Sequence, residues 1–301
     1  MPAANRPRVS VITPSLNQGA FIGRTLASVR AQTFSSKEHF IVDGGSSDST
    51  LSELSAQGPS VNWVSEPDRG QAHAVNKGIA RTTGDIVAWI NSDDVYYPGA
   101  LGEVVRFFDE HPDVDVLFGD ADHIDATDTV LERYPTEPFD ASRLLTTCYL
   151  CQPATFFRRH CVARYGPLDE RLHYCMDYEY WLRLARGGAK FAYLPVRLAG
   201  SRLHLDAKTI RARVPVHAEI NDMFLRVLGK VPDTWLENYA HVRSEERIDR
   251  RVRPLKFSVA VNYQTILAAL RWNRSISSAM RRKLLGRLRK FVLGEREVRS
   301  A

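Results

Sequence analysis

The chain has 301 residues, 44% of them hydrophobic and 25% charged, which is typical of a globular protein with one large domain or two small ones. No apolar run approaches the roughly 20 residues that a membrane span needs. The polar first residues lead straight into a predicted strand, so we expect a cytoplasmic protein without a signal peptide.

The net charge of +6 is distributed unevenly along the chain. Residues 206–301 contain 21 Lys and Arg against 10 Asp and Glu, whereas residues 1–205 contain 20 and 25. This asymmetry predicts a boundary near residue 206, between an acidic catalytic region and a basic region, 207–301, that we expect to be helical.

The four cysteines are Cys148, Cys151, Cys161 and Cys175, and we expect them to be reduced and partly buried. Cys148 and Cys151 have the CxxC spacing of some metal and redox sites. Neither a second such pair nor a His pair follows at zinc-ribbon distance, so a metal or redox role is the weaker alternative.

Strands and helices are predicted to alternate over the first 118 residues. The β-branched apolar runs at 8–13, 39–42, 61–64, 86–90 and 114–118 indicate strands, the first of them stopped by Pro14. Helices are predicted after residue 20, after residue 49, at 71–81 and at 98–110. Such alternation indicates βαβ units and a mostly parallel sheet.

Polar residues follow these strands at the point where each one ends. They are Pro14 and Ser15, Asp43, the 66–69 segment with Asp68 and Arg69, and residues 91–94. In open α/β sheets, ligands bind beyond the carboxyl ends of the strands. Each cluster alone could be a solvated turn, but four strand ends converging on one crevice favour a binding site.

Asp93 and Asp94 end the strand at 86–90. Adjacent carboxylates repel each other, so a divalent cation, or a ligand carried by one, is the simplest reason to keep them together. The alternative is a polar turn in which one Asp caps the following helix.

Beyond residue 118 the pattern changes. We predict a loop at 119–125, strands at 130–134, 153–157, 190–194 and 197–203, and a helix at 139–147. A further helix carries Asp177 in its first turn, where the helix dipole favours a negative charge. Asp177 could be such a helix-end charge or a functional carboxylate.

The region from residue 209 onward is predicted to be helical and basic. Residues 276–292 combine Arg and Lys with apolar side chains in an amphipathic pattern. Such a helix could bind peripherally to the inner face of an anionic membrane, or it could pack against its own domain.

Taken together, the motifs resemble family 2 glycosyltransferases with the GT-A fold. The resemblance rests on residues 9–17, 41–50, 65–71, 76–78, 91–94, 152–157, 176–183 and 202–204, which follow the family's order. It implies an α/β GT-A domain over 1–206, with a nucleotide-sugar half at about 8–119 and an acceptor half at about 120–206.

The resemblance also implies a role for each motif. Asp177 matches the catalytic base, Asp94 the direct ligand of Mg²⁺ or Mn²⁺, and His204 a group near the diphosphate or metal. The donor nucleotide is expected to contact Thr13, Pro14, Ser15, Asp43, Arg69 and Asp93. Acceptor-side or supporting positions are Gln152, Glu179, Trp181 and Arg202.

The sequence departs from the family's pattern at two positions. Many members have a second acid after the one that Asp43 matches, whereas this chain has Gly44. The first acidic position of the DxD-like motif is an amide, Asn91. We therefore expect Asp94 to carry more of the metal binding.

The expected activity is an inverting, metal-dependent transfer of a sugar, hexosyltransferase-like, from a UDP-, GDP- or dTDP-sugar to a hydroxyl of a glycan or lipid-linked acceptor. Such a transfer would serve cell-surface polysaccharide or glycoconjugate synthesis. The alternatives are a non-catalytic nucleotide-sugar or glycan-binding module and a sugar nucleotidyltransferase, although the latter usually has a basic, Gly-rich loop where this chain has residues 14–18. No nucleic-acid recognition motif accompanies the basic region, so no nucleic-acid partner is expected.

Overall fold

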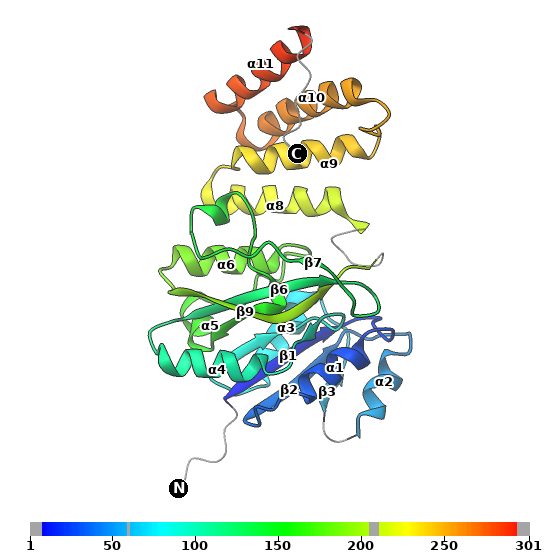
Figure 1. Cartoon of the computed structure of the whole chain (residues 1–301), viewed down its shortest axis with the longest axis vertical. Helices are drawn as coiled ribbons and strands as arrows, with labels where there is room; N and C mark the ends of the chain where they lie inside the picture. Colours follow the sequence, from blue (N-terminus) through cyan, green and yellow to red (C-terminus); the bar gives the residue numbers. More distant parts are fainter. Residues whose placement is uncertain (1–7, 59–60, 205–210, 294–301) are drawn as a thin grey trace. The chain divides into compact units, whose positions relative to one another are not determined.

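The computed structural model describes residues 8–58, 61–204 and 211–293, with side chains described up to residue 287. Figure 1 shows the strands of a twisted sheet with helices on both faces, and a separate group of helices near the C-terminus. The contacts within the chain divide it into two units, residues 1–210 and 211–301.

The N-terminal unit is built around β1 (Val9–Ser15), which is buried along its whole length. β1 pairs in parallel with β2 (Lys37–Asp43) on one side and β4 (Ile86–Trp89) on the other, and β3 (Asn62–Ser65) pairs in parallel with β2. The carboxyl ends of these four strands therefore meet at one edge of the sheet.

Pro14 lies inside β1, although we predicted that it would end the strand. The Ile12 carbonyl accepts from the Ile90 N–H, so the backbone of Ile12 points toward β4. The backbone groups of successive residues in a strand point to alternate sides, so the backbone nitrogen of Pro14 also points toward β4. The pairing with β4 ends at Ile12, so the missing N–H of Pro14 leaves no ladder hydrogen bond unmade.

The predicted α/β fold with a mostly parallel sheet is confirmed, although the sheet is mixed, not purely parallel. β8 (Thr155–Arg158) lies antiparallel between β4 and β6 (Val116–Ile124), and β9 (Phe191–Arg202) runs parallel to β6. The short strands β5 (Val95–Tyr96) and β7 (Val130–Arg133) pair antiparallel with β9 and β6. The strand order is β3-β2-β1-β4-β8-β6-β9-β5, with β7 on β6.

Two long strands, β6 and β9, occupy the part of the sheet where we predicted a loop and shorter strands. β6 continues through residues 119–124, which we predicted as a loop, and β9 joins the two strands predicted at 190–194 and 197–203. The polar residues Asp120 and Asp122 are buried in β6, where tyrosine hydroxyls and arginines bind their carboxylates. A polar sequence can therefore form a strand here. The helix predicted at 139–147 is a single 3₁₀ turn, Arg143–Leu145.

Helices cover both faces of the sheet because its side chains alternate between them. On one face Val11 and Phe156 belong to a core with Leu101 of α4, and Ile41 packs with Leu26 of α1. The helices of this face are α1 (Ile22–Arg30), α2 (Thr50–Ala56) and α4 (Ala100–Glu110).

On the other face, Phe157 makes edge-to-face contact with Trp181 of α6, and α3 lies so close that a Cβ at Gly78 would meet Ile12 at 2.4 Å. The helices of this face are α3 (Gln71–Ala80) and α6 (Met176–Arg186), and α5 (His160–Tyr165) contacts α6.

The C-terminal unit is entirely helical in its described part. Ala240, Phe257 and Val261 form a small core between α9 and α10. No helix in the described residues is both long and apolar enough to cross a bilayer. The helices are α8 (Arg213–Leu228), α9 (Asp233–Glu245), α10 (Pro254–Asn273) and α11 (Ser278–Leu293).

Candidate active site

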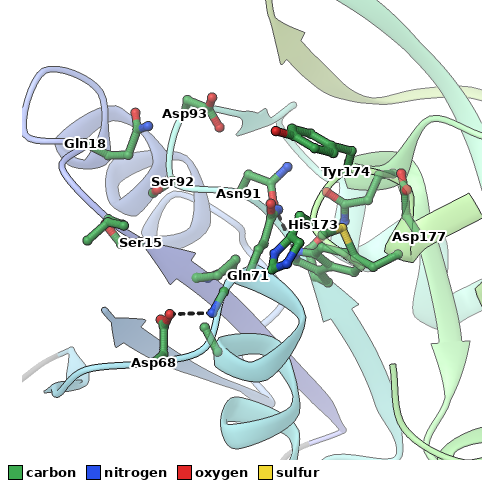
Figure 2. A pocket seen from close by; sticks show the side chains of 17 residues that line it. Ser15, Gln18, Asp68, Gln71, Asn91, Ser92, Asp93, His173, Tyr174 and Asp177 are labelled. Atoms are coloured by element: carbon green, nitrogen blue, oxygen red, sulfur yellow. Dashed lines mark hydrogen bonds between the residues drawn. The ribbon is translucent and has the colours of Figure 1, made fainter. Parts of the chain in front are cut away.

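A pocket of about 280 Å³ opens where β1, β3 and β4 end, and the start of α6 also lines it. Five of the residues that we predicted for the site line this pocket: Pro14, Ser15, Asp93, Gln152 and Asp177. They come from segments that are far apart in the sequence, and Figure 2 shows Asp93 and Asp177 on different sides of the pocket, with Tyr174 between them in this view.

Asp93 reaches the pocket from the loop after β4 and contacts His204. The distance between Asp93 Oδ2 and His204 Nε2 is 3.0 Å, and the His204 side chain is only 8% exposed. The ring of Phe21 lies against the imidazole, with 4.6 Å between the ring centres. A carboxylate oxygen and an imidazole nitrogen held this close can bind one divalent cation such as Mn²⁺.

Asp94 does not line the pocket, although we predicted it as the direct metal ligand. It is 4% exposed, and its two oxygens accept from the Arg202 backbone N–H at 2.8 Å and the Asn91 amide at 3.3 Å. Burial raises the pKa of the Asp94 carboxyl well above its ordinary value, and the neighbouring charge of Asp93 raises it further.

The side-chain contacts of residue 91 explain why an amide stands there instead of an acid. Asn91 Oδ1 accepts from the Trp89 indole at 2.9 Å and from the Gln71 amide at 2.6 Å, while its NH₂ group donates to Asp94. An ionised carboxylate at position 91 would have no hydrogen to donate and would repel Asp94. Asn91 therefore orders the loop that presents Asp93.

Asp177 lies in the first turn of α6 and lines the pocket. The Tyr178 backbone N–H donates to its Oδ1 at 2.8 Å. A carboxylate at a helix N-terminus is stabilised in its charged form by the helix dipole. Asp177 can therefore accept a proton from a group bound in the pocket.

Two buried polar atoms of the pocket have no hydrogen-bond partner in the described part of the chain. They are Ser15 Oγ and Gln152 Oε1, in side chains whose residues are 5% and 8% exposed. Gln152 is held in place because its NH₂ group donates to the Trp89 carbonyl at 2.5 Å. Buried polar atoms usually have partners, so these two indicate where a ligand would bind.

Asp43 does not line the pocket but organises the loop beside it. It is fully buried and accepts from the backbone N–H groups of Gly45 and Ser46, at 3.0 and 2.9 Å, and from the Ser65 hydroxyl. A Cβ at Gly44 would meet the Asp68 carboxylate at 2.7 Å. Gly44 therefore leaves room for Asp68, which lines the pocket beside the position where the family resemblance led us to expect a second acid.

The remaining predicted site residues lie outside the pocket lining. Arg69 has a 69% exposed side chain that forms an ion pair with Glu170. Glu179 is buried and holds Arg183 through hydrogen bonds of 2.9 Å, and Trp181 is buried against β8. These contacts stabilise the fold of the segment that carries Asp177.

Arg202 ties together the loops around Asp93. Its guanidinium, which is completely buried, donates to the backbone carbonyls of Asp93 and Asp125, at 2.6 and 2.5 Å, and pairs with the Asp128 carboxylate. Its backbone N–H holds Asp94. His204 follows two residues later.

Gln71, His173 and Tyr174 are among the lining residues that we did not predict for the site. Gln71 is the first residue of α3 and belongs to the 65–71 motif. His173 and Tyr174 lie in the turn before α6, where the sequence shows only a polar and an aromatic residue ahead of the helix. No spacing rule identifies them, because the turn reaches the pocket only through the tertiary fold.

Thr13 is buried in the sheet rather than exposed to the pocket. Its hydroxyl is 2.9 Å from His39 Nε2 on β2. Burial lowers the pKa of His39 from its ordinary 6.5 to about 3, and the charge of Lys37 lowers it further.

We expect this histidine to make the fold sensitive to acid. Because the folded chain resists protonation of His39, its contribution to stability is complete above pH 6.5 and is lost as the pH falls toward 3. The loss is at most about 1.4 kcal/mol per pH unit. Urea unfolding between pH 4.5 and 7 should show a shallower pH dependence in His39→Gln than in the wild type, and parallel curves would refute this assignment.

A separate group of possible metal ligands, Asp115, His160 and Cys161, does not line the pocket. Its members are already engaged: Asp115 accepts from His160 Nε2 at 2.7 Å and from the Lys190 backbone N–H at 2.8 Å. Burial raises the pKa of the Cys161 thiol to about 12, which disfavours the thiolate that binds metals.

The comparison with protein families decides what kind of protein this pocket belongs to. The model described as "Glycosyl transferase family 2" matches residues 10–166, which include β1 from its second residue onward, β4, Asp93 and Gln152. The chain belongs to this family. It is therefore a glycosyltransferase, as the motifs predicted.

Individual relatives agree with this assignment. An uncharacterized glycosyltransferase of Mycobacterium tuberculosis is 35% identical over 184 residues, covering 60% of this chain and 69% of the relative. A "PGL/p-HBAD biosynthesis glycosyltransferase" of Mycobacterium bovis is 30% identical over 186 residues, covering 59% and 69%.

Solved structures share the GT-A fold of this glycosyltransferase. TarS 1-349 of S. aureus, in complex with UDP-GlcNAc, has a TM-score of 0.64 and 17% identity, covering 91% of this chain and 82% of TarS. The mannosyltransferase PcManGT of Pyrobaculum calidifontis, in complex with GDP-Man and Mn²⁺, has a TM-score of 0.59 and 18% identity, covering 97% and 88%.

Proposed function

We propose that this glycosyltransferase uses a nucleotide-sugar donor and transfers the sugar, with inversion and with the help of a divalent metal, to a hydroxyl of a glycan or lipid-linked acceptor. The observation that carries the proposal is the pocket at the strand ends, which holds Asp93 and Asp177 on different sides. Relatives of known structure bind UDP-GlcNAc or GDP-Man, which supports a nucleotide-sugar donor.

We assign the metal to Asp93 and His204 rather than to Asp94. Asp93 lines the pocket and contacts His204, whereas both oxygens of Asp94 are occupied inside the protein. The carboxylate oxygen of the pair suits Mg²⁺ or Mn²⁺, whereas the imidazole nitrogen is a poorer ligand for Mg²⁺, which prefers oxygen; Mn²⁺ accompanies GDP-Man in PcManGT. When bound, the cation would neutralise the charge of the leaving diphosphate.

Asp177 is our candidate for the general base. A sugar hydroxyl attacks the anomeric carbon only when a base takes its proton, and a single carboxylate opposite the leaving group is sufficient for an inverting displacement. Asp177 is on another side of the pocket from Asp93, which supports this division of roles. Ser15 Oγ and Gln152 Oε1 would then accept hydrogen bonds from hydroxyl groups of the donor or the acceptor.

We further propose that Asp68 takes the place of the second acid that the family resemblance led us to expect beside Asp43. Its carboxylate lies against Gly44 and lines the pocket, and its Oδ1 accepts from the Gly70 N–H at 2.8 Å. Held in this way, the carboxylate can accept hydrogen bonds from the nucleoside of the donor.

A donor screen tests the proposed function. UDP-, GDP- and dTDP-sugars are added with and without Mn²⁺, and the true donor should raise the unfolding temperature, because saturation at 100 times Kd stabilises a protein by about 2.7 kcal/mol. With an acceptor, free nucleoside diphosphate should appear. Release of pyrophosphate would indicate a nucleotidyltransferase instead, and binding without turnover would indicate a binding module.

Variants in the same screen test Asp68. Asp68→Ala should weaken donor binding while leaving the melting temperature of the free protein nearly unchanged. Glu66→Ala, in the same loop but outside the pocket lining, is the matched control. Equal donor affinity in both variants would remove Asp68 from the donor site.

A further inference from the structure

α10 of the C-terminal unit exposes a row of large apolar side chains. The row's members are spaced four, four, four and three residues apart, so they drift gradually around the helix but stay within about a third of its circumference. Its members are Leu255, Val259, Tyr263, Leu267 and Leu270, which are 64%, 51%, 59%, 41% and 49% exposed.

The opposite side of α10 is the one that packs within the unit. Phe257, Val261 and Trp272 are buried there, the first two against Ala240 of α9. A helix that is apolar all round is normally covered all round. In the described part of the unit α10 is covered on one side, and a continuous exposed apolar row of this size usually marks an interaction surface.

The surroundings of the row are strongly basic. Residues 250–294 contain twelve Lys and Arg and no Asp or Glu. Of these, Lys256, Arg271 and Arg274 are exposed at the two ends of α10, beside the row. The partner must therefore be apolar at its centre and negatively charged at its margin.

This charge pattern disfavours a second copy of the chain as the partner. In an antiparallel pair of α10 helices, Lys256 would face Arg271 and Arg274 of the other copy. In a parallel pair each cation would face its own counterpart. Both arrangements bring like charges together, which costs free energy.

We propose that α10 lies along the surface of an anionic lipid bilayer. The apolar row would enter the boundary between headgroups and acyl chains, and the flanking Lys256, Arg271 and Arg274 would contact the lipid phosphates. This contact lies in the plane of the membrane and does not need a spanning helix.

The proposal differs from the sequence-based prediction, which gave residues 276–292 either a membrane contact or packing against their own domain. In α11, Met280 and Leu284 are buried. Lys283 and Arg287 each pair with Glu237 of α9, at 3.1 Å. These contacts favour the packing alternative for the described side chains of α11, whereas those beyond residue 287 lie outside the described set.

Cosedimentation with vesicles tests the proposal on the full chain. Vesicles of phosphatidylcholine alone are compared with vesicles that also contain phosphatidylglycerol, at low and high salt. One variant removes the row (Leu255→Gln, Val259→Gln, Leu270→Gln) and another the charges (Lys256→Gln, Arg271→Gln, Arg274→Gln). The matched control changes exposed residues of α11 (Arg281→Gln, Arg282→Gln, Leu285→Gln).

We expect the wild type to bind the anionic vesicles, with binding that weakens at high salt. Each α10 variant should bind about tenfold or more weakly, because basic residues near an anionic surface and apolar side chains in the headgroup boundary both contribute to binding. The α11 control should keep most of the binding. All changed side chains are exposed, so the melting temperatures should stay close to that of the wild type.

Several results would overturn the proposal. They are no binding of the wild type to anionic vesicles, undiminished binding by the α10 variants, or a loss confined to the α11 control. A concentration-dependent dimer in light scattering that disappears in the apolar-row variant would assign the surface to a second copy of the chain instead.

Discussion

Asp177→Asn should lower kcat by about 10²–10⁴-fold, the range that loss of a general base produces. The amide has nearly the same shape as the carboxylate, so it should still accept from the Tyr178 N–H, but it cannot take a proton from the acceptor. Metal-dependent donor binding and the melting temperature should remain close to those of the wild type. Turnover is measured as release of nucleoside diphosphate.

Asp169→Asn is the control for this experiment. It removes one negative charge from the segment before α6, at a residue that pairs with Arg171 and does not line the pocket. It should leave turnover nearly unchanged. Full activity in Asp177→Asn would exclude this residue as the base.

Asp93→Asn should impair metal-dependent donor binding, whereas Asp94→Asn should impair stability. Asp93→Asn replaces a charged ligand by a neutral one, and the Mn²⁺-dependent part of donor affinity should fall by at least about 10–100-fold, as changes at metal sites typically do. Stability should change little, since Asn has nearly the same shape as Asp and its amide oxygen can still accept a hydrogen bond from His204 Nε2. Isothermal titration with and without Mn²⁺ measures the affinity.

Asp94→Asn should instead lower the free energy of unfolding, by about 1–3 kcal/mol. Its amide oxygen can accept from the Arg202 N–H, but its NH₂ group would then face the NH₂ group of Asn91, now 3.3 Å from the Asp94 carboxylate. Urea unfolding measures the loss. If Asp94→Asn abolished metal-dependent binding while Asp93→Asn kept it, the metal would belong to Asp94, as the motif alone suggested.

The sequence predicts the first half of the N-terminal unit well because the signals there are local. Each parallel strand there is a short β-branched run that ends in polar residues, and the parallel order brings Pro14, Asp93 and the loop with Asp68 to one edge. The second half is harder to predict. Buried Asp120 and Asp122 make β6 look like a loop, and only their distant partners, such as Tyr193 and Tyr97, reveal the strand.

The difference between local signals and distant contacts also explains which site residues the sequence could predict. Motif position named Asp93, Gln152 and Asp177 as site residues, and all three line the pocket. It could not distinguish Asp93 from Asp94, because these neighbours differ only in the direction of their side chains. That direction depends on Arg202, which is more than 100 residues away in the sequence.

The buried guanidinium of Arg202 has a consequence for the energetics of substrate capture. It joins the loop of Asp93 to the end of β9 and to the turn at Asp125 and Asp128, so these segments are ordered before any ligand arrives. The conformational entropy of fixing Asp93 beside His204 is lost during folding, not during binding. We therefore expect donor binding on this side of the pocket to need little rearrangement of the protein.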